Sequence, residues 1–269
     1  MKTAVIVTTY NRPDALAAVF AGYDAQSDGD FELLVADDGS TDETKDLVAN
    51  HAARARFPLH HVWQEDRGFR PGAARNRAAA RATADYLIFV DGDCVPARDF
   101  VRWHKALAEK NYFLSGNRVL LSESFTRQVL AANLPVHQWH AARWLQAWMT
   151  RDVNRLLPLL TLPDASFRKR SPQQWQGVKT CNLSLWRKDF MRVNGFDESY
   201  SGWGLEDSDL AIRLIHAGVH HKSARFATPV FHLWHRENDR VRLAENQKLL
   251  DELIASNRIE ARAGVNQYS

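Results

Sequence analysis

The sequence predicts an α/β protein with a doubly wound, mostly parallel (mixed) sheet, helices on both faces and a helical C-terminal elaboration. Four short apolar segments in the first ninety residues alternate with helical segments, which is typical of a parallel sheet. One of them, residues 86–90, is a run of five apolar or aromatic residues, as expected for a strand buried on both faces. Polar residues end three of the four segments.

The first half of the chain supplies four strands and the helices between them. Asn11 can cap a first helix that has Pro13 in its first turn. Ser40, with Glu43 three residues later, predicts a capping box for the second helix. The expected strands are residues 4–8, 31–36, 59–63 and 86–90, and the second and third helices are residues 41–52 and 71–83.

The character of the sequence changes after residue 100, where longer helical segments separate the strands. No internal repeat or low-complexity linker interrupts it, so we expect one domain. The expected elements are a helix at 99–109, a strand at 112–121, a helical segment at 123–170, a strand around 180–185, a helix beginning near Glu206, a strand leading into 230–235, and a helix at 240–256.

Composition excludes several classes of protein. The net charge of +3 is too small to indicate nucleic acid. Cys94 and Cys181 do not make a disulfide framework and fit a reduced, cytosolic setting. Met1 leads into a strand-like segment rather than a secretory leader, and no run approaches the ~20 apolar residues of a membrane span. We therefore expect a cytoplasmic protein whose membrane contact, if it has any, is peripheral.

Polar clusters at residues 8–13, 37–40 and 91–93 point to a ligand site. Ligands of open α/β sheets bind beyond the carboxyl ends of the strands, and carboxylates such as Asp91 and Asp93 suit divalent cations that hold phosphates. Turn chemistry or helix capping is the alternative for each cluster alone, but three together favour a site. No GxGxxG or GxxxxGK[ST] loop follows the first strand, which argues against a dinucleotide oxidoreductase or a P-loop enzyme.

The motifs TTYNRP, DDGSTD, RGFRPGAARNRA and FVDGDCVP occur in this order. With them, residues 3–237 resemble the inverting family 2 glycosyltransferases of the GT-A fold. The later segments NGFDE and GWGLED are similar to the acceptor half of β-1,4-galactosyltransferases and chondroitin polymerases. The resemblance implies a single GT-A domain over residues 1–269, with a nucleotide-sugar half at 1–121, a helical insertion rich in tryptophan and arginine at 122–172, an acceptor and catalytic half at 173–238, and a C-terminal helix and tail at 239–269.

On the sugar-donor side, the resemblance implies that Thr8, Tyr10 and Asp38 hold the uracil of a UDP-sugar. Arg75 would lie near the diphosphate or the sugar, although a helix-surface charge is the alternative for it. Asp91 would contact the ribose or the sugar, and Asp93 would bind a divalent metal, Mn²⁺ or Mg²⁺. The implied donor-binding residues are Thr8, Tyr10, Asn11, Arg12, Asp38, Arg75, Asp91, Gly92 and Asp93.

On the acceptor side, the resemblance implies Asp207 as the general base and Glu206 as the residue that orients acceptor hydroxyls. Trp203 and Gly204 would also contact the acceptor, and we expect an exposed indole on which a sugar ring can stack. An acidic first turn, which the helix dipole favours, is the alternative explanation for Glu206. The aspartate run that galactosyltransferases carry after the glutamate is DSD here, which leaves the acceptor sugar open.

His232 and His235 are candidate metal ligands, because imidazole binds transition metals. A hydrogen-bonding role is the alternative for either one alone. Transferases that resemble this chain complete the metal shell with a histidine at this place. We therefore expect at least one of the two to join Asp93.

The implied function is metal-dependent, inverting transfer of a hexose or N-acetylhexosamine from a UDP-sugar to a hydroxyl of a glycan, in bacterial cell-surface polysaccharide or lipopolysaccharide synthesis. The alternatives are a nucleotidyltransferase, a nucleotide-sugar diphosphohydrolase, and a non-catalytic module that binds nucleotide sugars or glycans. A base beside an acceptor site is needed only for transfer, which favours the first interpretation.

Residues 137–170 carry several tryptophans and arginines, a composition that suits an interface with anionic lipid. On this interpretation the acceptor is a lipid-linked glycan and the protein contacts the cytoplasmic face of the inner membrane. An ordinary helical subdomain with buried tryptophans is the alternative, and the sequence slightly favours it.

Overall fold

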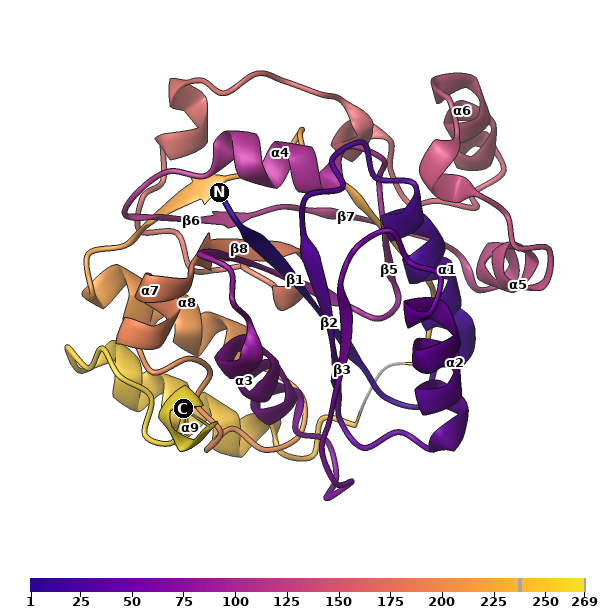
Figure 1. The fold of residues 1–269 in the computed structure, drawn as a ribbon. Coiled ribbons are helices and arrows are strands. Elements are labelled where there is room, and N and C mark those ends of the chain that lie inside the picture. The colour runs from indigo at the N-terminus through magenta and orange to yellow at the C-terminus, as the bar shows by residue number, and fades with distance from the viewer. Residues whose placement is uncertain (237–238, 269) are drawn as a thin grey trace.

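In the computed structural model, which describes residues 1–236 and 239–268, the centre of the protein is a mixed seven-stranded sheet (Figure 1). Its strand order is β3-β2-β1-β4-β8-β6-β9. The first four are parallel, whereas β8 runs antiparallel to both β4 and β6. The strands are β1 (Thr3–Thr9), β2 (Glu32–Asp37), β3 (Leu59–Trp63), β4 (Tyr86–Asp91), β6 (Tyr112–Ser115), β8 (Leu183–Trp186) and β9 (His220–Ser223).

Helices cover both faces of this sheet, because successive strand residues point to opposite sides. In β1, Val5 and Val7 pack with α1, α2 and α4, while Ala4 and Ile6 pack with α3, α7 and α8. The predicted fold class is therefore confirmed. The helices are α1 (Pro13–Asp24), α2 (Asp42–Ala52), α3 (Pro71–Arg81), α4 (Phe100–Leu107), α5 (Glu123–Ala131), α6 (Ala141–Met149), α7 (Arg187–Arg192), α8 (Glu206–His216) and α9 (Leu243–Ile254).

A small second sheet brings distant parts of the chain together. Its strands are β5 (Cys94–Pro96), β10 (Val230–His232) and β7 (Arg118–Leu120), in that order. β10 pairs antiparallel with β5, and the Leu233 N–H then donates to the Asp93 carbonyl at 2.9 Å. The segment after the D-x-D motif is thereby held against the histidine-containing strand.

Neither predicted helix cap forms. Asn11 has a φ of 48°, and its side-chain oxygen accepts from the Thr41 N–H at 2.9 Å. The Ser40 hydroxyl accepts from the Asn11 N–H at 2.8 Å rather than capping α2. The loops after β1 and β2 are neighbours because their strands are parallel, so these side chains bond the two loops to each other.

Three predicted boundaries are also wrong. The strand expected at residues 112–121 is two strands, since β6 belongs to the seven-stranded sheet and β7 to the three-stranded one. Gly116 lies between them, where a Cβ would be 2.3 Å from the Asn182 side chain. The helix expected at residues 240–256 is shorter, running over α9 only, and the strand expected to reach residue 235 ends at His232. None of the described helices is both long and apolar enough to cross a membrane.

Candidate active site

The three polar clusters meet at one edge of the sheet, as predicted. In the parallel register Thr8 lies beside Asp91 and Thr9 beside Asp37. Gly92 turns the chain directly over β1, donating its N–H to the Thr8 carbonyl at 2.7 Å. A Cβ at Gly92 would lie 2.9 Å from that oxygen, so a larger residue would displace the D-x-D turn.

Arg75 lies at the centre of this edge. Alanines of α3, such as Ala74 and Ala78, pack closely on the sheet and carry Arg75 inward, where its side chain is only 5% exposed. Its guanidinium donates to the Thr8 hydroxyl and to an Asp91 oxygen, both at 3.0 Å, and pairs with Glu206 at 3.5 Å. A helix-surface charge is therefore the wrong interpretation of Arg75.

Carboxylates outnumber cations around Arg75. Burial raises the pKa of Asp91 to about 6, with Asp93 and Asp207 adding to the increase and Arg75 opposing it. Burial and the adjacent Asp207 raise the pKa of Glu206 to about 7, again against Arg75. The excess of negative charge makes this edge a place where an added cation or proton is stabilised.

Asp207 lies in the first turn of α8, where the helix dipole favours a carboxylate. Its Oδ1 atom accepts from the Thr180 hydroxyl at 2.8 Å. Leu205 enters the helix with a φ of 77°, so the chain bends sharply before Glu206 and turns both acidic side chains toward the sheet edge. Sequence reasoning missed Thr180, since nothing in the sequence pairs it with a residue 27 positions away.

Trp203 is less accessible than predicted. The indole is partly buried, and the Arg240 guanidinium lies over it at 5.0 Å from the ring centroid. Gly202 and Gly204 flank it with positive φ values of 71° and 105°, which let the loop fold tightly against α9. The prediction of an exposed indole is therefore corrected: the ring is partly buried and the Arg240 guanidinium lies over it.

Asp93, His232 and His235 converge, as predicted for metal ligands. The Asp93 carboxylate lies 3.6 Å from His232 Nε2 and 3.3 Å from His235 Nε2. Burial lowers the pKa of His232 to about 4, which keeps the imidazole in the neutral, metal-binding form. A carboxylate with two imidazoles fits a divalent cation such as Mn²⁺. Their role as ligands stays a prediction.

The remaining residues predicted to bind the sugar donor differ in their accessibility. Tyr10 is 46% exposed and donates to Asp66 at 2.9 Å, so its ring remains open for stacking. Asp38 is buried, and its two oxygens already accept from Gln64 and from the Arg70 N–H, both at 2.6 Å. Sequence reasoning gave no role to these three partners, which belong to the loop after β3.

Two predicted residues do not reach the carboxylate cluster. The Arg12 guanidinium pairs with Asp14, in the first turn of α1, at 2.9 Å. Asn11 is used in the bond to Thr41 between the loops. A contact of either residue with the sugar donor stays a prediction.

Comparison with known families identifies the class of protein. Residues 4–167 match the family described as "Glycosyl transferase family 2", and residues 164–236 match the "N-terminal domain of galactosyltransferase". The chain therefore belongs to the family 2 glycosyltransferases. The predicted resemblance is confirmed in both halves.

Two curated relatives show how much of a longer protein this chain matches. Validoxylamine A glucosyltransferase of Streptomyces hygroscopicus subsp. jinggangensis is 32% identical over 231 residues, covering 80% of this chain and 52% of the relative. Chondroitin synthase of Escherichia coli is 25% identical over 245 residues, covering 83% and 34%. The chain thus spans about half of the first relative and a third of the second.

Solved structures of low sequence identity support the GT-A fold. S. aureus TarS 1–349 superposes with a TM-score of 0.64 at 16% identity, covering 100% of this chain and 68% of that one. The mannosyltransferase PcManGT from Pyrobaculum calidifontis, in complex with GDP-Man and Mn²⁺, gives a TM-score of 0.62 at 20% identity, covering 94% and 64%.

Proposed function

We propose that this protein is a metal-dependent inverting glycosyltransferase that moves a hexose or N-acetylhexosamine from a UDP-sugar to a hydroxyl of a glycan. One observation carries the proposal. The buried Arg75 joins Thr8 and Asp91, at the sugar-donor edge, to Glu206, which is adjacent to Asp207. A leaving diphosphate and an attacking hydroxyl would therefore meet around one guanidinium.

The reaction would be a single displacement at the anomeric carbon with inversion. Asp207, oriented by Thr180, accepts the proton of the acceptor hydroxyl as that oxygen attacks. Glu206 and Trp203 position the acceptor. A divalent metal held by Asp93, His232 and His235 would act as a Lewis acid on the diphosphate.

Several features support the choice of substrates. The exposed ring of Tyr10 offers a stacking surface for a base. Among proteins of similar fold, TarS 1–349 has been solved with UDP and with UDP-GlcNAc, whereas PcManGT was solved with GDP-Man. Two relatives are named chondroitin synthase and hyaluronan synthase, which supports a polysaccharide as the acceptor.

Binding of the sugar donor gives a direct test. We expect UDP-sugar with Mn²⁺ to raise the thermal midpoint, because a ligand at 100 times its Kd stabilises the native state by about 2.7 kcal/mol. EDTA or Asp93→Ala should remove most of this stabilisation. Asp46→Ala, at an exposed position of α2, is the matched control and should keep it. Absence of stabilisation by UDP-, GDP- and dTDP-sugars in the native protein would reject the proposal and favour a glycan-binding module.

Hydrolysis is the alternative enzyme activity, since a diphosphohydrolase could use the same metal carboxylates. The Glu206 and Asp207 pair beside Arg75 supports transfer, because a base for an acceptor hydroxyl is needed only for transfer. Release of UDP that is as fast without an acceptor as with one would favour hydrolysis.

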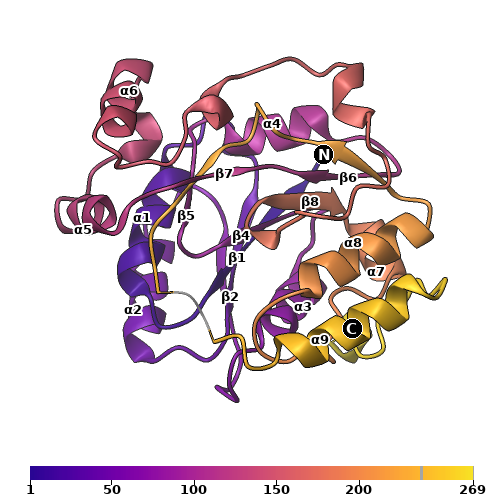
Figure 2. The ribbon, with the colours of Figure 1, turned by 180° about the vertical axis from the view of Figure 1, so that it is seen from behind.

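We also propose that an apolar and basic surface around α6 contacts anionic membranes. Trp144 is buried and stacks on Phe231 at 4.4 Å between centroids, so the prediction of buried tryptophans is correct for this ring. Trp148 and Met149, in contrast, are 48% and 72% exposed. In both views α5 and α6 lie at the end of the molecule opposite α8 and α9 (Figures 1 and 2).

This surface, which we call the α6 face, combines the two features that interfacial helices use. Its exposed apolar residues are Leu145, Trp148 and Met149 of α6, and the exposed Leu157 and Leu160 follow in the next segment of the chain. Its exposed basic residues are Arg143, Arg151 and Arg155. Anionic headgroups would pair with the arginines while the apolar side chains enter the headgroup region.

Vesicle flotation tests the α6 face. We expect association with anionic vesicles and a loss of at least about tenfold in Trp148→Asp/Met149→Asp, because each buried apolar side chain contributes ~1.5–3 kcal/mol. Ile254→Asp, on α9, removes a similarly exposed side chain elsewhere and should leave association unchanged. No flotation of the wild type with anionic vesicles would reject this surface as a membrane contact.

A further inference from the structure

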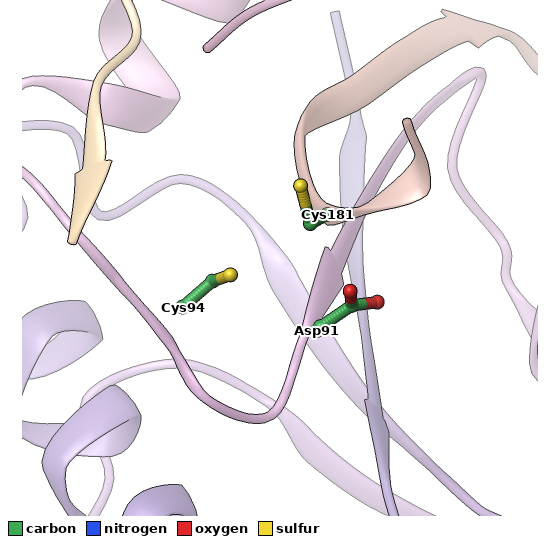
Figure 3. A group of neighbouring side chains, drawn as sticks. All are labelled: Asp91, Cys94 and Cys181. Atoms are coloured by element: carbon green, nitrogen blue, oxygen red, sulfur yellow. The ribbon is translucent and has the colours of Figure 1, made fainter. Parts of the chain in front are cut away.

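Two thiols lie directly behind the carboxylate cluster. Cys94 is the first residue of β5, and Cys181 lies in the short 3₁₀ turn Thr180–Asn182 beside Thr180, the hydrogen-bond partner of Asp207. Both thiols are free and buried. In Figure 3 the Cys94 side chain points from its strand toward Asp91 and Cys181. The proposed transfer reaction uses neither thiol.

Their geometry is close to that of a metal site. One ligand atom from each of Asp91, Cys94 and Cys181 lies within 4.8 Å of the other two. Some point is then within about 2.8 Å of all three atoms, compared with zinc distances of ~2.3 Å to sulfur and ~2.0–2.2 Å to oxygen. A shift of roughly half an ångström in each ligand atom would bring all three to bonding distance from a zinc ion. Asp93, Cys94 and His232 form a second such group, so Cys94 lies in both.

The types of ligand atom determine which cation this site prefers. Thiolates prefer Zn²⁺ and related thiophilic cations, whereas Mg²⁺ and Mn²⁺ prefer oxygen ligands. Binding would release one proton from each thiol, so that two thiolates, one carboxylate and a divalent cation carry a net charge of −1. The Arg75 guanidinium, 3.0 Å from an Asp91 oxygen, is placed to balance that charge.

We propose that Cys94, Cys181 and Asp91 form a binding site for a thiophilic divalent cation, next to the Asp93, His232 and His235 group. Three protein ligands leave the fourth position open to water. Asp91 is also a predicted contact of the sugar donor. If the proposed function holds, zinc at this site therefore inhibits transfer by engaging Asp91 and crowding the adjacent D-x-D turn.

Cobalt(II) is a suitable probe, because cobalt–thiolate bonds give an intense charge-transfer absorption that oxygen and nitrogen ligands do not. Adding Co²⁺ to the reduced protein should produce this band, and Zn²⁺ should abolish it. We expect the band to disappear in Cys181→Ala and in Cys181→Ser, two variants of opposite polarity in case one fails to fold. It should persist in His235→Ala, which alters only the other group.

The absorption experiment tests whether this cation site exists, and it needs no enzyme assay. A folded wild-type protein without the band, or a band that persists in both Cys181 variants, would overturn the site. The assay then decides the inhibitory role. With Mn²⁺ present, the Zn²⁺ concentration for half-inhibition should rise at least about tenfold in Cys181→Ala, and equal inhibition of both proteins would overturn that role. A protein with the band but without transfer would instead reject the proposed function.

Discussion

Replacing Asp207 with asparagine is expected to lower kcat by about 10²–10⁴-fold, the usual contribution of a general base. Asparagine has the same shape and can still accept from the Thr180 hydroxyl, so the geometry of the site should survive. It cannot take a proton from the acceptor hydroxyl. Affinity for the UDP-sugar should stay the same, because the proposed reaction uses Asp207 on the acceptor and not on the sugar donor. Steady-state kinetics and calorimetry with the sugar donor would measure the two effects separately.

Glu206→Gln tests whether Glu206, rather than Asp207, is the general base. Its raised pKa, about 7, lies near the operating pH, a property that suits a general base. If Glu206 instead orients the acceptor, Glu206→Gln should mainly raise the KM for the acceptor. Ser208→Ala, in the same turn, serves as the neutral control. Full turnover by Asp207→Asn together with a collapse of kcat in Glu206→Gln would transfer the role of base to Glu206.

Much of the fold follows from local sequence. The apolar run at residues 86–90 predicts a strand buried on both faces, and all five residues are buried in the centre of the sheet. Alternating strands and helices predict the parallel half. The antiparallel β8 is harder to predict, because β4 and β8 are almost a hundred residues apart and a short strand has no local signal for its direction.

Some features of the candidate site could also be predicted from the sequence, whereas others could not. The edge of the sheet could be predicted, since motifs at the ends of parallel strands converge once the topology is known. The expectation that at least one histidine joins Asp93 comes instead from the resemblance to known transferases, and both histidines lie beside Asp93. Thr180 and the cover over Trp203 could not, because both depend on contacts between segments that are far apart in sequence. Asn11 shows the same limit: its capping potential is real, but a neighbouring loop offers its side chain another partner.

Replacing Arg75 with methionine is expected to destabilise the protein by about 3–5 kcal/mol at pH 8, the cost of removing one partner from buried ion pairs. Asp91 is 31% exposed, so the lower end of this range is the better expectation. Donor binding should weaken too, because Thr8 and Asp91 lose their shared partner. Urea denaturation at several pH values would measure the effect on stability.

The pH dependence distinguishes charge balance from packing. Glu206 has a pKa of about 7 in the folded protein, above the ~4.3 of an unfolded glutamate, so its contribution to stability is full below ~4.3 and is lost as the pH rises through about 7. Arg75 opposes that increase, and without it the pKa should rise further. The destabilisation of Arg75→Met should therefore be larger at pH 8 than at pH 5.5.

Arg77 lies on the same helix as Arg75, and its guanidinium lies over the Tyr268 ring. Arg77→Met is the control, and it should lose the same stability at both pH values. An equally pH-independent loss in Arg75→Met would show that the guanidinium acts through packing alone.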